Sequence, residues 1–257
     1  MKILIVTNMY PSEGDVSWRG GFVKDQVTDI LDAAVNKENV EIDVFHIKGP
    51  ISGGGLREYI KLWPRLLMKL IFGGYDIVHS HHSFCTLMCL PWFFKLIYTV
   101  HEGELNNTSW RSNLIQLAIA VSGVAIYVSH SEFMESKKKK KFFLPCGVDL
   151  QLFEPFCGEK EGYILFPANP NRPEKNASIL RECAALKYST TGEQLHSIYG
   201  GSIPKEDMPS VRAQAAGVVS SGKDESDGMV LKEAMACNVP VIATRVGNHE
   251  YYLQGGG

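Results

Sequence analysis

Residues 225–244 read ESDGMVLKEAMACNVPVIAT and combine a polar loop, a helical stretch and an apolar run that ends in threonine. Two carboxylates, Glu225 and Glu233, stand eight positions apart, one on the loop and one in the predicted helix. The first N–H groups of a helix have no partner within it, so they favour a phosphate nearby. Carboxylates accept hydrogen bonds from the vicinal hydroxyls of a sugar. The spacing alone, however, is more often that of two surface glutamates around a turn.

The sequence around this stretch alternates between short apolar runs and helical patterns. In the second half, the runs predict strands over residues 163–166, 195–199, 217–219 and 239–243, with helices over 176–186, 229–236 and 248–253. The first half shows the same alternation, with predicted strands over residues 2–7, 40–45, 77–80, 97–101 and 123–128 and helices over 22–34 and 56–72. This order indicates an α/β fold with parallel sheets, whose ligands bind at the carboxyl ends of the strands.

The stretch between the two halves is typical of a linker. Residues 147–162 are rich in charged residues and turn formers, and the strand–helix pattern restarts after them. We therefore place a boundary near residue 155, which gives domains of residues 1–155 and 156–257. Each domain is expected to be doubly wound, with a cleft between the two as the place for a ligand.

The charge of the chain argues against one class of function. Its 257 residues carry a formal net charge of −2, whereas bulk nucleic-acid binding needs a basic field. One basic run, residues 137–141, is expected to be a solvated surface loop. No apolar stretch approaches the roughly 20 residues of a membrane span, and the apolar start is too short for a signal peptide. We expect a cytoplasmic protein, or one peripheral to the inner face of a membrane.

The sequence also argues against metal and redox sites. The six cysteines form no CxxC pair, so free thiols are expected. The histidines of residues 79–82 have no carboxylate or cysteine at a spacing that would suit zinc. An NAD-dependent oxidoreductase is disfavoured because no GxGxxG follows the first strand.

The segment that starts at Glu225 is similar to the Glu-x7-Glu signature of the family-4 glycosyltransferases, whose usual form is Glu-Gly-x-Pro-x-x-x-x-Glu-Ala-x-Ala. Residues 237–244 fit that family as well. Two positions depart from the usual form, since Ser226 stands where the family has glycine and Gly228 where it has proline. The resemblance runs from residue 2 to about residue 253. It implies the GT-B fold, in which two Rossmann-like domains face a cleft.

The resemblance places a nucleotide-sugar site in the second half of the chain. It implies that Glu225 holds the hydroxyls of the donor sugar and that Glu233 holds the ribose. The start of the helix, at Gly228 and Met229, would contact the diphosphate through its backbone N–H groups.

Two cations in the segment ILFPANPNRPEKN (residues 164–176) resemble the family's pair that faces the donor diphosphate. They are Arg172 and Lys175. Cations suit this place, because negative charge grows on the diphosphate as the glycosidic bond breaks. The guanidinium can bind two phosphate oxygens at once, and the ammonium acts as a point charge.

Three stretches of the first half also resemble the family. The loop WRGGF (residues 18–22) is similar to its glycine loop, where Gly20 and Gly21 would let the backbone approach a phosphate. The run YTVHEG (residues 98–103) is similar to the strand that ends near the transferred sugar, which implies a site role for His101. The run DIVHSHH (residues 76–82) is similar to the preceding strand, and its histidines are expected to be structural or acceptor-side.

The resemblance implies a retaining glycosyltransferase that moves a sugar from a nucleoside-diphosphate sugar to an acceptor hydroxyl on a glycan or a lipid-linked molecule. The departing phosphate would help to take the acceptor's proton, so no protein nucleophile, metal or cofactor is implied. The expected catalytic residues are His101, Glu225, Arg172 and Lys175. Two alternatives stay open: a nucleotide-sugar epimerase on the same fold, and a non-catalytic relative that only binds the nucleotide sugar.

The helix predicted over residues 56–72 carries a basic residue at every fourth position among many apolar ones. Such a helix can lie on an anionic membrane surface, or it can cover the sheet and turn a basic face to solvent. Members of the family usually continue beyond the point that corresponds to residue 257. We therefore expect a truncated second domain with about four strands, and weak or no activity of this chain alone.

Overall fold

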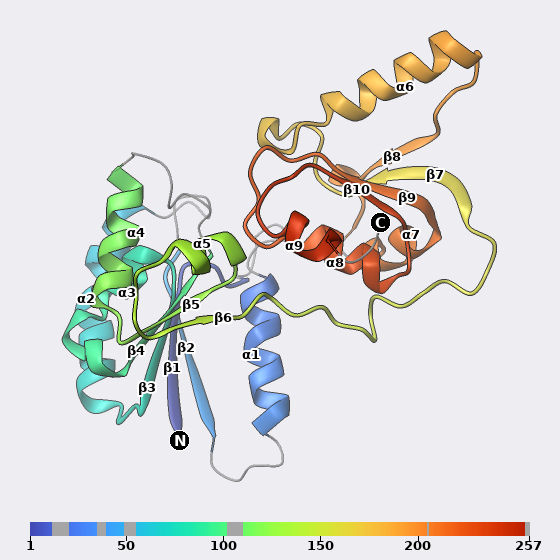
Figure 1. The fold of residues 1–257 in the computed structure, drawn as a ribbon. Coiled ribbons are helices and arrows are strands. Elements are labelled where there is room, and N and C mark those ends of the chain that lie inside the picture. The colour runs from blue at the N-terminus through green and yellow to red at the C-terminus, as the bar shows by residue number, and fades with distance from the viewer. Residues whose placement is uncertain (12–20, 35–39, 49–54, 102–109, 205, 255–257) are drawn as a thin grey trace. The chain divides into compact units, whose positions relative to one another are not determined.

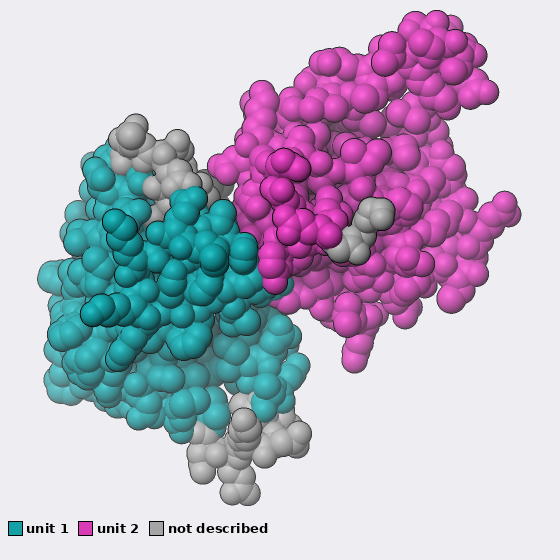
Figure 2. All heavy atoms as spheres, in the orientation of Figure 1, with its two compact units in different colours: residues 1–146 teal, residues 147–257 magenta. Residues whose placement is uncertain are grey.

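A computed structural model of the chain describes residues 1–11, 21–34, 40–48, 55–101, 110–204 and 206–254. The chain forms two compact units, Met1–Cys146 and Gly147–Gly257, which Figure 1 draws as ribbons and Figure 2 in two colours. Each unit is built on a parallel sheet, so the predicted α/β fold class is confirmed.

The described part of unit 1 contains a six-stranded parallel sheet in the order β2-β1-β3-β4-β5-β6. Its strands are β1 (Lys2–Thr7), β2 (Glu41–His46), β3 (Ile77–His81), β4 (Leu96–Val100), β5 (Val124–Tyr127) and β6 (Lys141–Phe143). Its helices are α1 (Gly21–Ala34), α2 (Leu56–Phe72), α3 (Ser83–Met88), α4 (Trp110–Val121) and α5 (His130–Glu135), with a 3₁₀ turn at Leu90–Lys95.

Strand β1 is buried on both faces because helices pack on each side of the sheet. Leu4 and Val6 belong to a cluster that includes Leu66 of α2, whereas Ile3 and Ile5 pack with Val27 of α1. Figure 1 shows α1 on one side of the sheet and α2 on the other. A strand buried on both faces is apolar at every position rather than at alternate ones, which is the pattern of residues 3–6.

The described part of unit 2 contains a four-stranded parallel sheet in the order β10-β9-β7-β8, and the expectation of about four strands is met. Its strands are β7 (Glu161–Phe166), β8 (Ser197–Tyr199), β9 (Ala215–Ser220) and β10 (Val241–Ala243). Its helices are α6 (Ser178–Thr191), α7 (Met208–Gln214), α8 (Met229–Ala236) and α9 (His249–Leu253), with 3₁₀ turns at Pro173–Lys175 and Gly200–Ser202.

The units divide between Cys146 and Gly147, ahead of the boundary expected near residue 155. The physical reason lies in Phe153, which packs against the apolar cluster of unit 2 and under the guanidinium of Arg212, 5.1 Å from its ring centroid. The polar composition of residues 147–162 gives no sign of this contact.

The basic run is not a solvated loop throughout. Lys138 donates to the carbonyls of Ile119, at 2.8 Å, and Ala120, at 3.2 Å, near the carboxyl end of α4. Lys141 begins β6 and donates to the carbonyls of Phe133 and Ser136 at the end of α5. Cations are favourable at helix carboxyl ends, where the last carbonyls lack partners. The remaining lysines of the run are exposed, as expected.

Both sheets reverse their strand order at one place. In unit 1, β1 lies between β2 and β3, and in unit 2, β7 lies between β8 and β9. At such a switch point the connections leave toward opposite sides and open a crevice at the carboxyl ends of the two central strands. The candidate residues follow these strands: Arg172 and Lys175 follow β7, Glu225 follows β9, and His81 ends β3.

Candidate functional site

The segments that follow β7 and β9 are joined at the carboxyl edge of the second sheet. The backbone N–H of Lys223 donates to the carbonyl of Glu174 at 2.8 Å. The hydroxyl of Ser221 donates to the carbonyl of Asn176 at 2.9 Å, and Asn176 has a left-handed backbone with a φ of 54°. These contacts bring together two predicted parts of the site that are far apart in the sequence.

Lys175 and Glu225 face each other across this junction. The ammonium of Lys175 donates to Oε2 of Glu225 at 2.5 Å, and both side chains are partly exposed, 20% and 23%. Partial exposure leaves the pair within reach of a ligand. The two predicted site residues therefore lie in one place, with their charges paired.

Arg172 lies beside the same segment and forms an ion pair of its own. Its Nε donates to Oε1 of Glu174 at 2.7 Å, and the two side chains are 42% and 46% exposed. The backbone N–H of Glu174 and the guanidinium of Arg172 lower the pKa of the Glu174 carboxyl. Arg172 is thus at the predicted edge, engaged by an acid that the sequence analysis did not single out.

Helix α8 begins at Met229, directly after Gly228. Gly228 has a φ of 78°, a left-handed backbone that proline cannot adopt, because its ring holds φ near −65°. A Cβ on Gly228 would lie 2.6 Å from Cδ2 of His249. Glycine rather than proline at position 228 therefore suits the local structure. The His249 ring packs directly against the backbone at this position, where a side chain would not fit.

Residues that follow β10 hold the turn between Glu225 and Glu233 in place through hydrogen bonds. Nδ1 of His249 donates to the carbonyl of Thr244 at 2.8 Å, and the hydroxyl of Thr244 donates to the carbonyl of Gly222 at 2.6 Å. Asp227 is also buried, and it accepts hydrogen bonds from Lys232 at 2.5 Å, Asn248 at 2.9 Å and Tyr252 at 2.6 Å. The turn between the two glutamates is consequently held in one conformation. The sequence analysis identified none of these supporting residues.

Glu233 lies within α8 and forms an ion pair with Arg212 of α7. The Arg212 side chain is only 3% exposed, and that of Glu233 is 18% exposed. Arg212 also contacts the ring of Phe153. A buried guanidinium is rare unless it is paired, so Arg212 needs this carboxylate. No motif had pointed to Arg212, which stands 21 positions from its partner.

In unit 1, His101 directly follows β4 and is half-buried. Its ring packs against Phe22 in the first turn of α1, with the ring centroids 4.8 Å apart. Gly21 is the first residue of α1 and is buried, whereas Gly20 lies outside the described residues.

Two further histidines line the same edge as His101. Nδ1 of His81 lies 3.0 Å from Nε2 of His101, and Nε2 of His79 lies 2.7 Å from the hydroxyl of Thr99. Burial lowers the pKa of His79 to about 4 and holds the pKa of His81 well below its usual value. His79 and His81 are thus neutral rather than charged near neutral pH.

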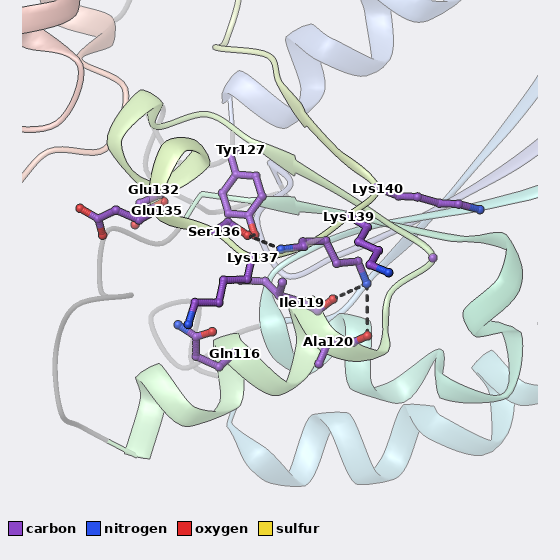
Figure 3. Close-up of a pocket in the computed structure, with 12 residues that line it drawn as sticks. Gln116, Ile119, Ala120, Tyr127, Glu132, Glu135, Ser136, Lys137, Lys139 and Lys140 are labelled. Atoms are coloured by element: carbon purple, nitrogen blue, oxygen red, sulfur yellow. Dashed lines mark hydrogen bonds between the residues drawn. The ribbon is translucent and has the colours of Figure 1, made fainter.

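A cavity of about 870 Å³ lies elsewhere in unit 1, between α4, α5 and the basic run. Figure 3 shows the residues that line it, with the carbonyls of Ile119 and Ala120 accepting hydrogen bonds. Two helix carboxyl ends meet here, so the backbone field opposes an anion, and desolvation lowers the pKa of Lys138. None of the predicted site residues that the structure describes lines this cavity.

Helix α2 buries Tyr59, Leu66 and Leu70 against the sheet. Large apolar side chains remain exposed on its other faces: Leu56, Ile60, Trp63, Met68, Ile71 and Phe72. Of the four regularly spaced basic residues, Arg57, Lys61 and Arg65 are exposed, whereas Lys69 turns to Asp43 at 3.0 Å.

Among the described residues, none of the helices combines the length and the apolar composition of a membrane span. Within the same residues, no three His, Cys, Asp or Glu side chains gather in a way that could hold a metal ion.

Part of the second unit matches a known protein family. Residues 182–256 match the family model described as "Glycosyl transferases group 1". No curated protein matches the chain.

Solved structures resemble the chain over nearly its whole length. Sucrose-phosphate synthase from Thermosynechococcus elongatus aligns with a TM-score of 0.69 at 16% identity, over 98% of this chain and 83% of that one. The apo form of the lipopolysaccharide outer core galactosyltransferase WaaB aligns at 0.62 and 13%, over 95% and 80%. The UDP-GlcNAc 2-epimerase of Methanocaldococcus jannaschii aligns at 0.57 and 12%, over 99% and 87%. These likenesses show a GT-B-like two-domain fold.

Proposed function

Because its second unit carries a domain of the glycosyl transferases group 1 family, we propose that this chain is a retaining glycosyltransferase. It transfers a sugar from a nucleoside-diphosphate sugar to a hydroxyl of a glycan or a lipid-linked acceptor. The family match covers residues 182–256, and the structural likenesses extend to both units.

The observation that most supports the proposal is the contact between Lys175 and Glu225 at 2.5 Å, at the switch point of the second sheet. A nucleotide-sugar donor has a charged diphosphate and a hydroxylated sugar. The cation at that edge suits the diphosphate, and the carboxylate suits the sugar hydroxyls. Arg172 and the first N–H groups of α8 add positive character at the same edge.

In the proposed reaction, the bond between the anomeric carbon and the diphosphate oxygen breaks, and negative charge grows on the leaving diphosphate. Arg172, Lys175 and the backbone N–H groups at Gly228 and Met229 stabilise that charge. The acceptor oxygen bonds to the anomeric carbon from the face that the diphosphate leaves. The acceptor's proton passes to the departing phosphate, so the reaction needs no protein nucleophile.

The remaining residues hold the donor. Glu225 accepts hydrogen bonds from the sugar hydroxyls, and Glu233 accepts them from the ribose. We assign His101 to the reacting sugar, and we assign Gly20 and Gly21 to a close backbone approach to the donor.

A nucleotide-sugar epimerase is the second candidate, and one observation favours it. The solved structures that resemble this chain include UDP-GlcNAc 2-epimerases, such as the enzyme from Neisseria meningitidis with a TM-score of 0.60 at 13% identity. An epimerase would change the donor without any acceptor. The family match of residues 182–256 supports the transferase instead.

The exposed face of α2 supports a membrane-bound acceptor. Basic and apolar side chains lie side by side on it, which suits the surface of an anionic bilayer. The acceptor would then be presented at the surface on which the enzyme sits.

A binding screen by calorimetry against UDP-, GDP- and ADP-sugars tests the proposal. One of these donors should bind, and a product assay should then show that its turnover depends on an added acceptor. Glu225→Gln should weaken binding of that nucleotide sugar more than binding of the corresponding nucleoside diphosphate, because Glu225 is assigned to the sugar.

The exposed Glu193 of the same unit provides the matched control, since Glu193→Gln should leave both affinities unchanged. EDTA should have little effect on turnover, because protein cations are assigned to the diphosphate. Absence of binding to all three donors would refute the proposed function, and conversion of the donor alone would favour the epimerase.

A further inference from the structure

The carboxyl edge of the first sheet holds a pair of histidines, of which the proposed reaction uses only His101. His81 ends β3, and its Nδ1 lies 3.0 Å from Nε2 of His101, which follows β4. The two rings are stacked, with an interplanar angle of 19°. In the register of the sheet, His81 lies between Thr7 of β1 and Thr99 of β4, beside the switch point.

His81 carries a single ring proton. Its side chain is completely buried, and desolvation together with the neighbouring His79 and His101 holds its pKa far below the usual value. Its other nitrogen, Nε2, is also buried and has no hydrogen-bond partner in the part of the chain that the structure describes. The ring proton of His81 can therefore be on Nδ1 or on Nε2. The two tautomers differ in which ring nitrogen is left without a hydrogen-bond partner and in whether that nitrogen is a donor or an acceptor.

A proton on Nε2 would leave a buried N–H donor without an acceptor, which is unfavourable because the donor has lost its hydrogen bonds to water and gained none in return. A proton on Nδ1 is donated to His101 and leaves only an acceptor lone pair unpaired, which folded proteins tolerate more often. The burial of His81 thus favours the tautomer in which Nδ1 carries the hydrogen. Nε2 of His101 must then accept this hydrogen bond.

We propose that His81 is a positioning residue that fixes His101 in its Nδ1–H tautomer. The lone pair of the His101 Nε2 is occupied by His81, so this nitrogen cannot serve as a base. Nδ1 of His101 then carries the ring hydrogen, so this nitrogen can donate a hydrogen bond but cannot accept one. This consequence rests on the proposed function, because it concerns the sugar beside His101, whereas the tautomer itself depends only on the two rings.

Two observations tie His101 to a fixed orientation. Phe22 of α1 packs against its ring at 4.8 Å, and His81 stacks on it at 5.3 Å between ring centroids. His79, the next ring in the row, bonds to Thr99 and not to His101. Among the described histidines, His81 is therefore the one that bonds to the His101 ring. Its removal should let that ring change its orientation and its tautomer.

Nitrogen NMR of the intact chain with ¹⁵N-labelled histidine rings tests the tautomer directly, with His101→Gln identifying the resonances of His101. In the unaltered protein, His101 should show the Nδ1–H pattern. His81→Asn, whose amide can donate from the position of Nδ1, should retain that pattern. His81→Leu should lose it and give the Nε2–H form that free histidine side chains prefer. An Nε2–H pattern in the unaltered chain overturns the proposal, even if His81→Leu fails to fold, and so does an unchanged pattern in a folded His81→Leu variant.

Turnover supplies the second readout, once a donor and an acceptor are known. His81→Leu should lower kcat by about 10- to 100-fold with little change in KM, as partners that orient a functional histidine commonly do, whereas His81→Asn should stay near the unaltered rate. Equal losses in both variants would overturn the positioning role. The NMR result holds without any substrate, so a failure of the proposed transferase function would leave the tautomer assignment standing.

Discussion

The ammonium of Lys175 and the carboxylate of Glu225 lie 2.5 Å apart, although fifty positions separate them in the sequence. Each residue follows a different strand at the switch point of the second sheet. Arg172 pairs with Glu174, and Glu233 pairs with Arg212. Each predicted charged residue of unit 2 is therefore paired with a residue of opposite charge, so donor binding must rearrange or share these pairs.

Lys175→Ala should reduce turnover more than it weakens donor binding, because the ammonium acts on charge that develops as the bond breaks. We expect a loss in kcat on the order of a hundredfold, with a smaller change in KM. Steady-state kinetics with the identified donor measure both values. Lys187→Ala, which removes a partly exposed lysine of the same unit, is the control. A change confined to KM would mean that Lys175 binds only the ground state.

Glu174→Gln should have the opposite effect on donor binding. Glu174 accepts a hydrogen bond from the guanidinium of Arg172, so removal of its charge takes away one competitor of the diphosphate for that guanidinium. The pair is almost half exposed and worth no more than about 1 kcal/mol, so affinity should rise by a few-fold at most. Calorimetric titration with the nucleoside diphosphate measures this gain. Arg172→Ala should abolish it in the double variant, and a weaker affinity in Glu174→Gln would contradict the competition.

Glu233→Ala should lower both donor affinity and stability. The lost hydrogen bonds to the ribose should weaken nucleotide-sugar binding by about 1.5–3 kcal/mol. Breaking the buried pair should destabilise unit 2 by about 3–5 kcal/mol, since Arg212 is left uncompensated. Calorimetry of binding and hydrogen exchange of residues 147–257 measure the two effects. Unchanged affinity would remove Glu233 from the donor site.

The double variant Arg212→Met with Glu233→Leu separates these effects. Replacing both members of a buried pair by apolar residues often restores stability. Stability should therefore recover while donor affinity stays low. Recovery of affinity together with stability would mean that Glu233 acts only through the fold.

Acidification should destabilise unit 1 through His79. Burial lowers its pKa from the ordinary 6.5 to about 4, so the unfolded chain binds a proton that the folded chain excludes. The stability contributed by neutral His79 is thus complete above about pH 6.5 and is lost as pH falls toward 4, by about 3 kcal/mol. His79→Gln should flatten this dependence while its amide still reaches Thr99. Urea unfolding followed by tryptophan fluorescence reports on unit 1, because all four tryptophans lie in residues 1–146. An equal pH slope in the variant would contradict the assignment.

The double variant Lys61→Glu with Arg65→Glu should weaken binding to anionic vesicles. Each basic side chain near such a surface contributes about 1 kcal/mol, so charge reversal at both should lower partitioning by tenfold or more. Sedimentation with vesicles that contain phosphatidylserine measures it, and added salt should weaken the binding. Lys139→Glu with Lys140→Glu changes the net charge equally on another surface, so equal loss in that control would mean that α2 has no special role.

The alternation of strands and helices could be read from the sequence because its signal is local. The apolar runs of residues 2–7 and 163–166 predicted β1 and most of β7, and helical spacing predicted α2 and α8 with their observed bounds. The sequence analysis did not predict strand β6, because this strand has only three residues and depends on pairing with β5. The partial burial of Lys138 was not predicted either, because it depends on hydrogen bonds to carbonyls of α4, which lies earlier in the chain.

The sequence by itself determined which residues could carry the chemistry: the spacing of Glu225 and Glu233 on a loop and a helix, and the cations after β7. Only the tertiary structure decided their partners. Arg212 meets Glu233, His249 packs on Gly228, and His81 bonds to His101. These contacts join residues on different elements, and hydrogen bonds and ion pairs act over a few ångströms in space without regard to sequence separation. A local pattern therefore names the candidates, and the packing of strands and helices determines which of them meet.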